Sequence, residues 1–444
     1  MRIILAGLVA VLFPTIASAH GIGEVYALPV PLNYYLAGAA AAVALSFIGM
    51  AILLKRPGTA TATIINAAWL QPVLFWLRRV SLLLVLLLIG AGLVGTSDFT
   101  RNFAPTYFWI YFILGYAILS LIIGNIWDKL NPWKLIAETV GIKPGNKHIS
   151  GWVSVALLLM LYWWELVSGY AFYPQVIAGV LLSYSWIAVL MARYPNWFAE
   201  GEVFSVFFGT IGRIAPFKIG GDNRTLIRQR PSNWLGIDTA PAWLIAFAGV
   251  LLAGTSFDSI KETVFWSNWL DALGANSVSY VYFQTAGLLL TPVPFVLAYL
   301  GAIRSMSLLI GFPDWKLLAR KFIWAVIPVA FGYVLAHNFA LTILSGPNML
   351  SIISDPFGVG WDLFKTASLP QTSLILGAKA VWTIEIGFVI LAHIVGVWLS
   401  HIVALKLFDQ PATATKSQYP MMALMIAFTI TTLWLLSQPL VVGR

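Results

Sequence analysis

A chain of 444 residues in which 60% are hydrophobic and only 10% are charged cannot be a soluble globular protein, since such proteins usually carry about 25% charged residues. The composition indicates a polytopic membrane protein. The absence of cysteine excludes disulfides, thiolate metal ligands and a cysteine nucleophile. A net charge of +9 would point to nucleic acid in a soluble protein, but here its meaning depends on where the charges lie relative to the membrane.

The N-terminal residues have the pattern of a cleaved signal peptide. A basic start at Arg2 is followed by an apolar run over 3–13, which is too short to span a membrane, and by Ala17-Ser18-Ala19 immediately before His20. We expect residues 1–19 to be removed, so that His20 becomes the first residue of the mature chain, outside the cytoplasm. An uncleaved anchor is the alternative interpretation.

Ten apolar runs follow the signal, most of them close to the ~20 residues that an α-helix needs to cross the bilayer core. We expect an all-α, polytopic helical bundle in the lipid bilayer, with residues 20–444 as one transmembrane domain. Ten crossings that begin outside return the C-terminus to the outside. The expected spans are 33–54, 80–97, 106–126, 151–172, 175–193, 242–257, 278–301, 322–344, 376–404 and 421–440.

The basic residues support this orientation, because Lys and Arg gather in short cytoplasmic loops. Of the 26 Lys and Arg residues, 20 fall in the predicted inner connections. This asymmetry predicts a protein of a bacterial-type inner (plasma) membrane with both mature termini outside the cytoplasm. It also accounts for the positive balance without nucleic acid as a partner.

Three of the five histidines lie in two late spans, and ionisable side chains within apolar spans mark functional sites by default. His393 and His401 are eight residues apart, so on one helix they differ by about 80° in direction and ~12 Å in depth and cannot bind one ion. His337 and Glu385 are expected at a comparable depth in the outer half. We therefore expect a polar or metal site around His337 and His393, with the Asp355 loop above them and His401 in a supporting or relay role. Interhelical hydrogen bonds are the simpler alternative.

Several acids are expected at the outer side. Asp258 and Asp355 fall in outer loops or at outer helix ends, where a carboxylate can bind metal, act as a general base or simply be solvated. Glu165 and Glu385 fall within spans, where lipid offers no solvent, and structural and functional roles are equally open. We take Asp258, Asp355 and Glu385 as the candidate catalytic residues.

His20 adds a further candidate ligand. A histidine at a mature N-terminus offers its α-amine and its imidazole to the same metal ion, provided that both are unprotonated. We expect a divalent transition metal, copper or zinc, with His20, His337, His393 and His401 as the candidate ligands. The alternative is that a histidine follows the cleavage site by chance.

A set of short segments, spread over nearly the full length, carries a family resemblance. These are His20-Gly21-Ile22-Gly23-Glu24, Leu28-Pro29-Val30-Pro31, Gly254-Thr255-Ser256-Phe257-Asp258, Ala336-His337-Asn338-Phe339, Ser354-Asp355-Pro356-Phe357-Gly358, Trp361-Asp362-Leu363-Phe364 and His393-Ile394-Val395-Gly396 running to His401. Together they resemble the membrane-bound fenitrothion hydrolase type of organophosphorus hydrolase. The resemblance implies hydrolysis of an aromatic thiophosphate triester, with release of a phenol.

The residues are compatible with that chemistry at the outer leaflet. A bound metal could polarise the phosphoryl or thiophosphoryl group and activate water. Asp258 or Asp355 could orient that water or accept its proton, and Phe357 and Trp361 could hold an apolar leaving group. The expected partner is therefore an apolar small-molecule substrate that partitions into the bilayer.

Two other interpretations stay open. The first is a copper or other transition-metal transport or assembly protein, which the different depths of His337, His393 and His401 favour, although the nine methionines form no metal-binding motif. The second is a structural membrane subunit that needs a partner subunit for activity.

Overall fold

The computed structural model describes residues 19–21, 24–26, 31–55, 62–230, 235, 238–274, 277–369 and 376–438. Within these residues, nine helical segments are long and apolar enough to cross a membrane. The expectation of an all-α, polytopic helical bundle is thereby confirmed. The expected signal peptide lies outside the described residues except for Ala19.

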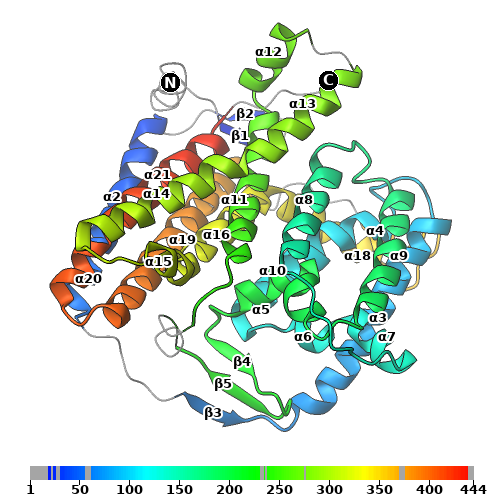
Figure 1. The fold of residues 1–444 in the computed structure, drawn as a ribbon. Helices are drawn as coiled ribbons and strands as arrows, with labels where there is room; N and C mark the ends of the chain where they lie inside the picture. The colour runs from blue at the N-terminus through cyan, green and yellow to red at the C-terminus, as the bar shows by residue number, and fades with distance from the viewer. Residues whose placement is uncertain are drawn as a thin grey trace.

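Residues 70–212 form one group of helices, seen on the right of Figure 1. In this group α3 packs against α9. The contact is so close that a Cβ atom added at Gly92 would lie only 2.5 Å from the carbonyl oxygen of Pro174. The group consists of α3 (Leu70–Val94), α4 (Phe103–Thr106), the π-helical η1 (Tyr107–Gly115), α5 (Tyr116–Ile123), α6 (Trp127–Leu130), α7 (Pro132–Val140), α8 (Trp152–Leu166), α9 (Pro174–Met191), η2 (Trp197–Gly201) and α10 (Val203–Gly212).

The remaining helices form a second group, most of it on the left and in the centre of Figure 1. Here α16 packs most extensively against α19, since Gly332 lets the two backbones approach. The group consists of α2 (Leu32–Leu53), α11 (Trp243–Lys261), α12 (Val264–Ala272), α13 (Ser277–Leu290), α14 (Pro292–Ile310), α15 (Trp315–Phe322), η4 (Ile323–Ala325), α16 (Ile327–His337), α17 (Phe339–Ser345), η5 (Gly346–Asn348), α18 (Met349–Ile352), α19 (Ala378–Leu407), α20 (Pro411–Ser417) and α21 (Tyr419–Leu436).

Short strands complete the fold. Strand β1 (Ala19–Gly21) pairs antiparallel with β2 (Glu24–Tyr26), with His20 opposite Val25. A second sheet has the order β3-β5-β4 and is antiparallel throughout, formed by β3 (Thr63–Asn66), β4 (Phe217–Ile219) and β5 (Thr225–Arg228). Figure 1 shows this sheet below the helices, at the opposite end from β1 and β2.

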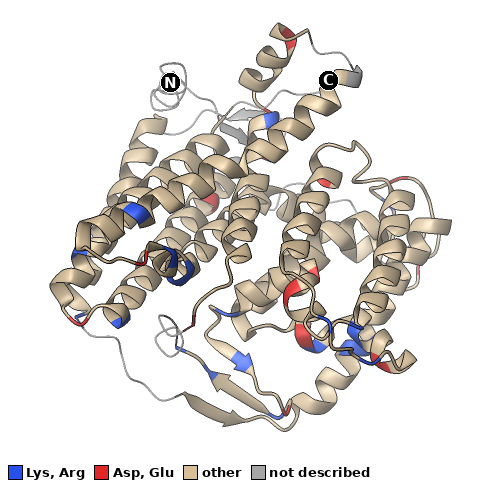
Figure 2. Ribbon diagram, in the orientation of Figure 1, with Lys and Arg blue, Asp and Glu red and all other residues tan. Residues whose placement is uncertain are grey.

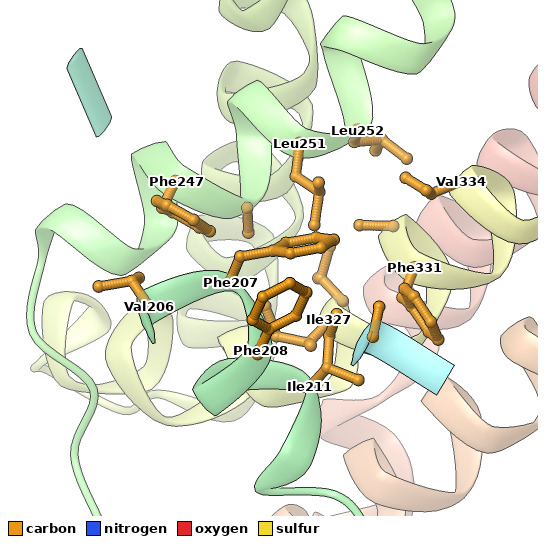
Figure 3. Packing of buried hydrophobic residues seen from close by; sticks show 14 of the residues in the cluster. Val206, Phe207, Phe208, Ile211, Phe247, Leu251, Leu252, Ile327, Phe331 and Val334 are labelled. Carbon is orange, nitrogen blue, oxygen red and sulfur yellow. The ribbon is translucent and has the colours of Figure 1, made fainter. Parts of the chain in front are cut away.

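The two groups share one hydrophobic core through α10, which at ten residues is too short to span a bilayer. Its N-terminus is capped by the buried Glu202, whose carboxylate accepts the backbone N–H groups of Phe204 at 3.0 Å and Ser205 at 2.8 Å. Figure 3 shows aromatic and aliphatic side chains of α10 gathered with side chains of α11 and α16; the labelled ones are Val206, Phe207, Phe208, Ile211, Phe247, Leu251, Leu252, Ile327, Phe331 and Val334.

Every expected span overlaps helical segments, but four differ in length or continuity. The span expected at 278–301 is divided between α13 and α14 at Thr291 and continues to Ile310. The span expected at 80–97 begins at Leu70, and the span expected at 151–172 is only the fifteen residues of α8. The span expected at 322–344 is broken, because α16 ends at His337 and Asn338 has φ −92° and ψ 3°. Hydropathy reflects apolar character and not backbone direction, so it predicted one span where the structure has α16 and α17.

Most Lys and Arg residues lie toward the end of the bundle that carries β3, β4 and β5, as Figure 2 shows. The distribution agrees with the asymmetry expected from the sequence. Apolar helices of this length indicate a lipid bilayer as the environment. The type of membrane and the side on which the termini lie stay predictions.

Candidate functional site

The central feature of the candidate site is a hydrogen-bonded pair formed by Asp258 and His337. The Nε2 atom of His337 lies 2.6 Å from Oδ2 of Asp258. The side chain of Asp258 is only 27% exposed and that of His337 only 22%. Asp258 lies in the last turn of α11, and His337 is the last residue of α16. A cationic ring is favoured at that position, because the C-terminal end of a helix carries partial negative charge.

Neighbouring groups hold both members of the pair in place. The second carboxylate oxygen of Asp258 lies 3.3 Å from Nζ of Lys261, one helical turn away. Nδ1 of His337 lies 3.3 Å from Oγ of Ser259, which also lies 3.0 Å from the hydroxyl of Tyr333. Both ring nitrogens and both carboxylate oxygens therefore have polar partners, and the imidazole has a fixed orientation.

The hydrogen bonds around Ser259 suit a doubly protonated ring. Ser259 can donate its single O–H to the carbonyl oxygen of Thr255, 3.3 Å away. Its oxygen then accepts from Tyr333 and from Nδ1–H of His337, while Nε2–H of His337 donates to Asp258. The arrangement can therefore hold a positive charge on His337 between Asp258 and the hydroxyl groups.

The pair borders a cavity of about 70 Å³. This volume holds a few water molecules or one small reacting group. Its polar lining comes from Tyr162, Glu165, Thr255, Asp258, His337 and Asn338, and most of the other wall is apolar, including Trp109, Phe204, Phe207, Leu251 and Leu341. Water-sized space next to an ionisable pair inside an apolar bundle is the setting in which proton transfer can be controlled.

Two further carboxylates, Glu165 and Glu385, lie close enough to His337 to interact electrostatically with its ring. Glu165 on α8 lines the cavity and has no hydrogen bond to another described residue. Glu385 on α19 is half-buried. Three acidic groups from three helices thus surround one imidazole.

From the sequence, structural and functional roles of Glu165 are equally open, and Lys261, Ser259 and Tyr333 are not among the predicted site residues. The spacing of Asp258 and Lys261 was a usable signal, because side chains three residues apart on a helix are neighbours. Nothing in the sequence indicated that Tyr333 and Ser259 meet.

Asp355 does not join this group. Its carboxylate oxygens accept the backbone N–H groups of Val359 at 3.0 Å and Gly360 at 2.7 Å. The carbonyl oxygen of Phe357 accepts the N–H of Thr96 at 2.8 Å, which ties the loop to the first group of helices. The expectation that Asp355 lies above His337 is therefore wrong, because the chain after α18 carries Asp355 across to α3. Phe357 and Trp361 pack against each other in this loop and do not line the cavity.

His393 and His401 are also separate from the pair. Nδ1 of His393 lies 2.8 Å from the carbonyl oxygen of Val389 in its own helix. His401 has both ring nitrogens engaged, one 2.8 Å from the carbonyl oxygen of Leu54 and the other 2.8 Å from the amide of Gln418. His401 was expected in a supporting or relay role for this site. Its hydrogen bonds instead connect α19 to the end of α2 and to the residue between α20 and α21.

The described side chains do not fit a copper or zinc centre with three or more ligands. No group of three His, Asp or Glu side chains in the described part of the chain is arranged to hold a metal ion. His20 lies on β1, which packs against α19. The structure describes its backbone and not its side chain. Metal binding that includes His20 stays a prediction.

The site is thus defined by an Asp–His pair on α11 and α16, a lysine that bonds the carboxylate, and a carboxylate on α8 across a small cavity. Ionisable groups in such surroundings mark function by default. Comparison of the chain with known protein families, curated proteins and solved structures finds no match.

Proposed function

We propose that this protein is a membrane-embedded hydrolase whose substrate is an apolar phosphotriester, of the aromatic thiophosphate kind that the sequence resemblance implies. The observation that carries the proposal is the Asp258–His337 pair at a cavity that Glu165 also lines. A carboxylate base facing a fixed imidazole is a constellation that can activate water and stabilise developing negative charge.

In the proposed reaction a water molecule in the cavity attacks phosphorus. Its oxygen forms a bond to phosphorus while the bond from phosphorus to the aryl oxygen breaks, and Glu165 takes the proton of the water. The imidazolium of His337, held by Asp258, stabilises the charge on the phosphoryl or thiophosphoryl group and gives a proton to the departing aryloxide. Glu165 then returns its proton to His337 through water. The products are a phosphodiester and a phenol.

A second, apolar cavity supports an aromatic substrate. It has a volume of about 340 Å³ and lies between α8, α9 and the start of α10. Leu161, Val203 and Phe204 line both cavities, so the two cavities adjoin. The smaller cavity alone is too small for a triester, since ligand pockets usually measure about 300–1,000 Å³. The larger one would hold the aryl group while the phosphorus centre lies near His337.

The proposal is tested in proteoliposomes of the full chain by measuring phenol release from an aromatic thiophosphate triester. Wild type is expected to release phenol, and Asp258→Asn and His337→Gln are expected to lose at least about 100-fold of the rate. His148→Gln, on an exposed loop, is the matched control and is expected to keep the full rate. No release by wild type, or equal rates in all four proteins, would refute the proposal.

A transition-metal transport or assembly function is the second candidate. It is favoured by the packing of β1 against α19, which brings the backbone of His20 to the helix that carries Glu385. Copper or zinc would be held by the imidazole and the α-amine of His20. Metal analysis of purified wild type and His20→Ala separates the two candidates. Loss of stoichiometric metal in His20→Ala, with no phenol release by wild type, would favour this function.

A further inference from the structure

A third hollow lies at the end of the bundle where most Lys and Arg residues gather. It is a crevice of about 530 Å³, and it is independent of the Asp258–His337 site, with which it shares no lining residue. One wall is apolar and consists of Leu54, Leu121, Ile214, Val395, Trp398 and Ile402, contributed by the end of α2, by α5, by the segment after α10 and by α19. The volume is that of a ligand-binding pocket.

The opposite wall is basic. Arg228, the last residue of β5, and Arg230 both line the crevice, and both are exposed. Neither has an acidic partner within 4.0 Å in the described part of the chain. The backbone of Arg228 is held by the central strand of the β3-β5-β4 sheet, opposite Thr63 and Phe217. One guanidinium group is thus carried by the sheet and the other follows two residues later, and guanidinium is the side-chain group best suited to phosphate.

We propose that this crevice binds one anionic phospholipid, with its phosphate at Arg228 and Arg230 and an acyl chain along the apolar wall. A soluble phosphate would gain nothing from six apolar side chains, and an uncharged hydrophobic ligand would gain nothing from two arginines. An anionic lipid satisfies both walls. The position also fits, since the crevice lies at the basic end of a bundle whose helices cross a bilayer.

The test is native mass spectrometry of the full chain purified in detergent, titrated with dioleoylphosphatidylglycerol, with dioleoylphosphatidylcholine and with inorganic phosphate. Wild type is expected to retain one copy of the anionic lipid in preference to the zwitterionic one. The double variant Arg228→Gln with Arg230→Gln is expected to bind it about 30-fold more weakly, at roughly fivefold per arginine. The matched control is Arg193→Gln with Arg304→Gln, two exposed arginines outside the crevice, and it is expected to match wild type.

A second variant tests the apolar wall while leaving the arginines in place. Val395→Trp adds bulk at a half-buried position of the crevice and is expected to reduce lipid retention without changing the melting temperature of lipid-free protein. Equal retention of both lipids by wild type, unchanged retention in the Arg228 and Arg230 variant, or full displacement of the lipid by millimolar inorganic phosphate would each overturn the proposal. None of these outcomes depends on hydrolysis at Asp258 and His337.

Discussion

Nε2 of His337 and Oδ2 of Asp258 lie 2.6 Å apart although the two residues are separated by 79 positions in the chain. This bond connects α11 to α16, so it contributes to stability as well as to chemistry. Asp258→Asn and His337→Gln are each expected to lower the free energy of unfolding by about 1–3 kcal/mol. The double variant is expected to lose about 1–2 kcal/mol less than the sum, because both changes remove the same interaction. Denaturant unfolding in detergent measures the three values, and strict additivity would show that the pair is not coupled.

Glu165 faces the cavity from α8 and is the proposed base. Glu165→Gln keeps the shape of the side chain but cannot take a proton, so we expect the hydrolysis rate to fall by about 10²–10⁴ with little change in melting temperature. Glu138→Gln removes an acid at the end of α7, where it pairs with Arg78, and serves as the control. A rate in Glu165→Gln equal to that of the control would assign the base to another group.

Gly332 determines how closely α16 approaches α19. A Cβ atom at this position would lie 2.2 Å from the Cβ of Ala392, whereas one at Gly387 of α19 would meet no atom within 4 Å. Gly332→Ala is therefore expected to destabilise the protein by about 1–3 kcal/mol through overpacking, and Gly387→Ala to leave it unchanged or slightly more stable. Because His337 lies on the displaced helix, hydrolysis should fall as well. Equal melting temperatures of the two variants would contradict the close approach.

His401 has a structural role in this fold, since it bonds the carbonyl oxygen of Leu54 and the amide of Gln418. His401→Phe retains a ring but removes the partner of the Leu54 carbonyl oxygen and one of the two hydrogen bonds of the Gln418 amide, which still donates to the carbonyl oxygen of Ala414. It is expected to cost about 1–3 kcal/mol. Its metal content should equal that of wild type. A loss of metal from the purified variant, with unchanged stability, would instead support a ligand role.

Asp362 is expected to make the loop between α18 and α19 sensitive to acid. Its carboxylate accepts the backbone N–H of Ala367 at 3.0 Å and the hydroxyl of Ser354 at 2.9 Å, and these bonds hold its pKa below the ordinary value of 3.8. A group whose pKa is lowered in the folded state contributes stability above the unfolded pKa and loses it as the pH falls through the folded value. We expect amide protection of Ala367 to decrease below about pH 4. In Asp362→Asn protection should already be low at neutral pH, and a variant protected like wild type would disprove the dependence.

The sequence predicted the membrane class, because hydropathy over about twenty residues reflects burial in lipid directly. It predicted ten crossings, whereas nine helical segments among the described residues are long and apolar enough to cross, since α8 has only fifteen residues. It predicted Asp258 and His337 as site residues individually, yet their contact depends on how α11 and α16 cross. Asp355 was expected above them because the predicted topology puts its loop on the same outer side. The real neighbours of Asp355 are its own loop and α3, which only tertiary packing determines.

The break at Asn338 was hidden for a related reason. The run from 322 to 344 is mostly apolar and has no proline or glycine after Gly332, so only the polar residues His337 and Asn338 mark the place where α16 ends. Beyond α17 a tertiary contact holds the chain, since the hydroxyl of Tyr111 donates to the carbonyl oxygen of Gly346 at 2.9 Å. Helix ends that depend on distant partners are invisible to local patterns.

The buried helix α10 has a consequence for biosynthesis. Its residues 203–212 are translated about 115 residues before α16 begins, yet α16 supplies part of the apolar surface that covers Phe207 and Ile211. Since chains emerge from the ribosome at roughly 5–20 residues per second, that face of α10 stays uncovered for several seconds or longer. The Glu202 cap and the contacts with α5, α6 and α8 have to hold α10 during that interval. Assembly of this protein therefore finishes late, when α16 is inserted against a helix that was made much earlier.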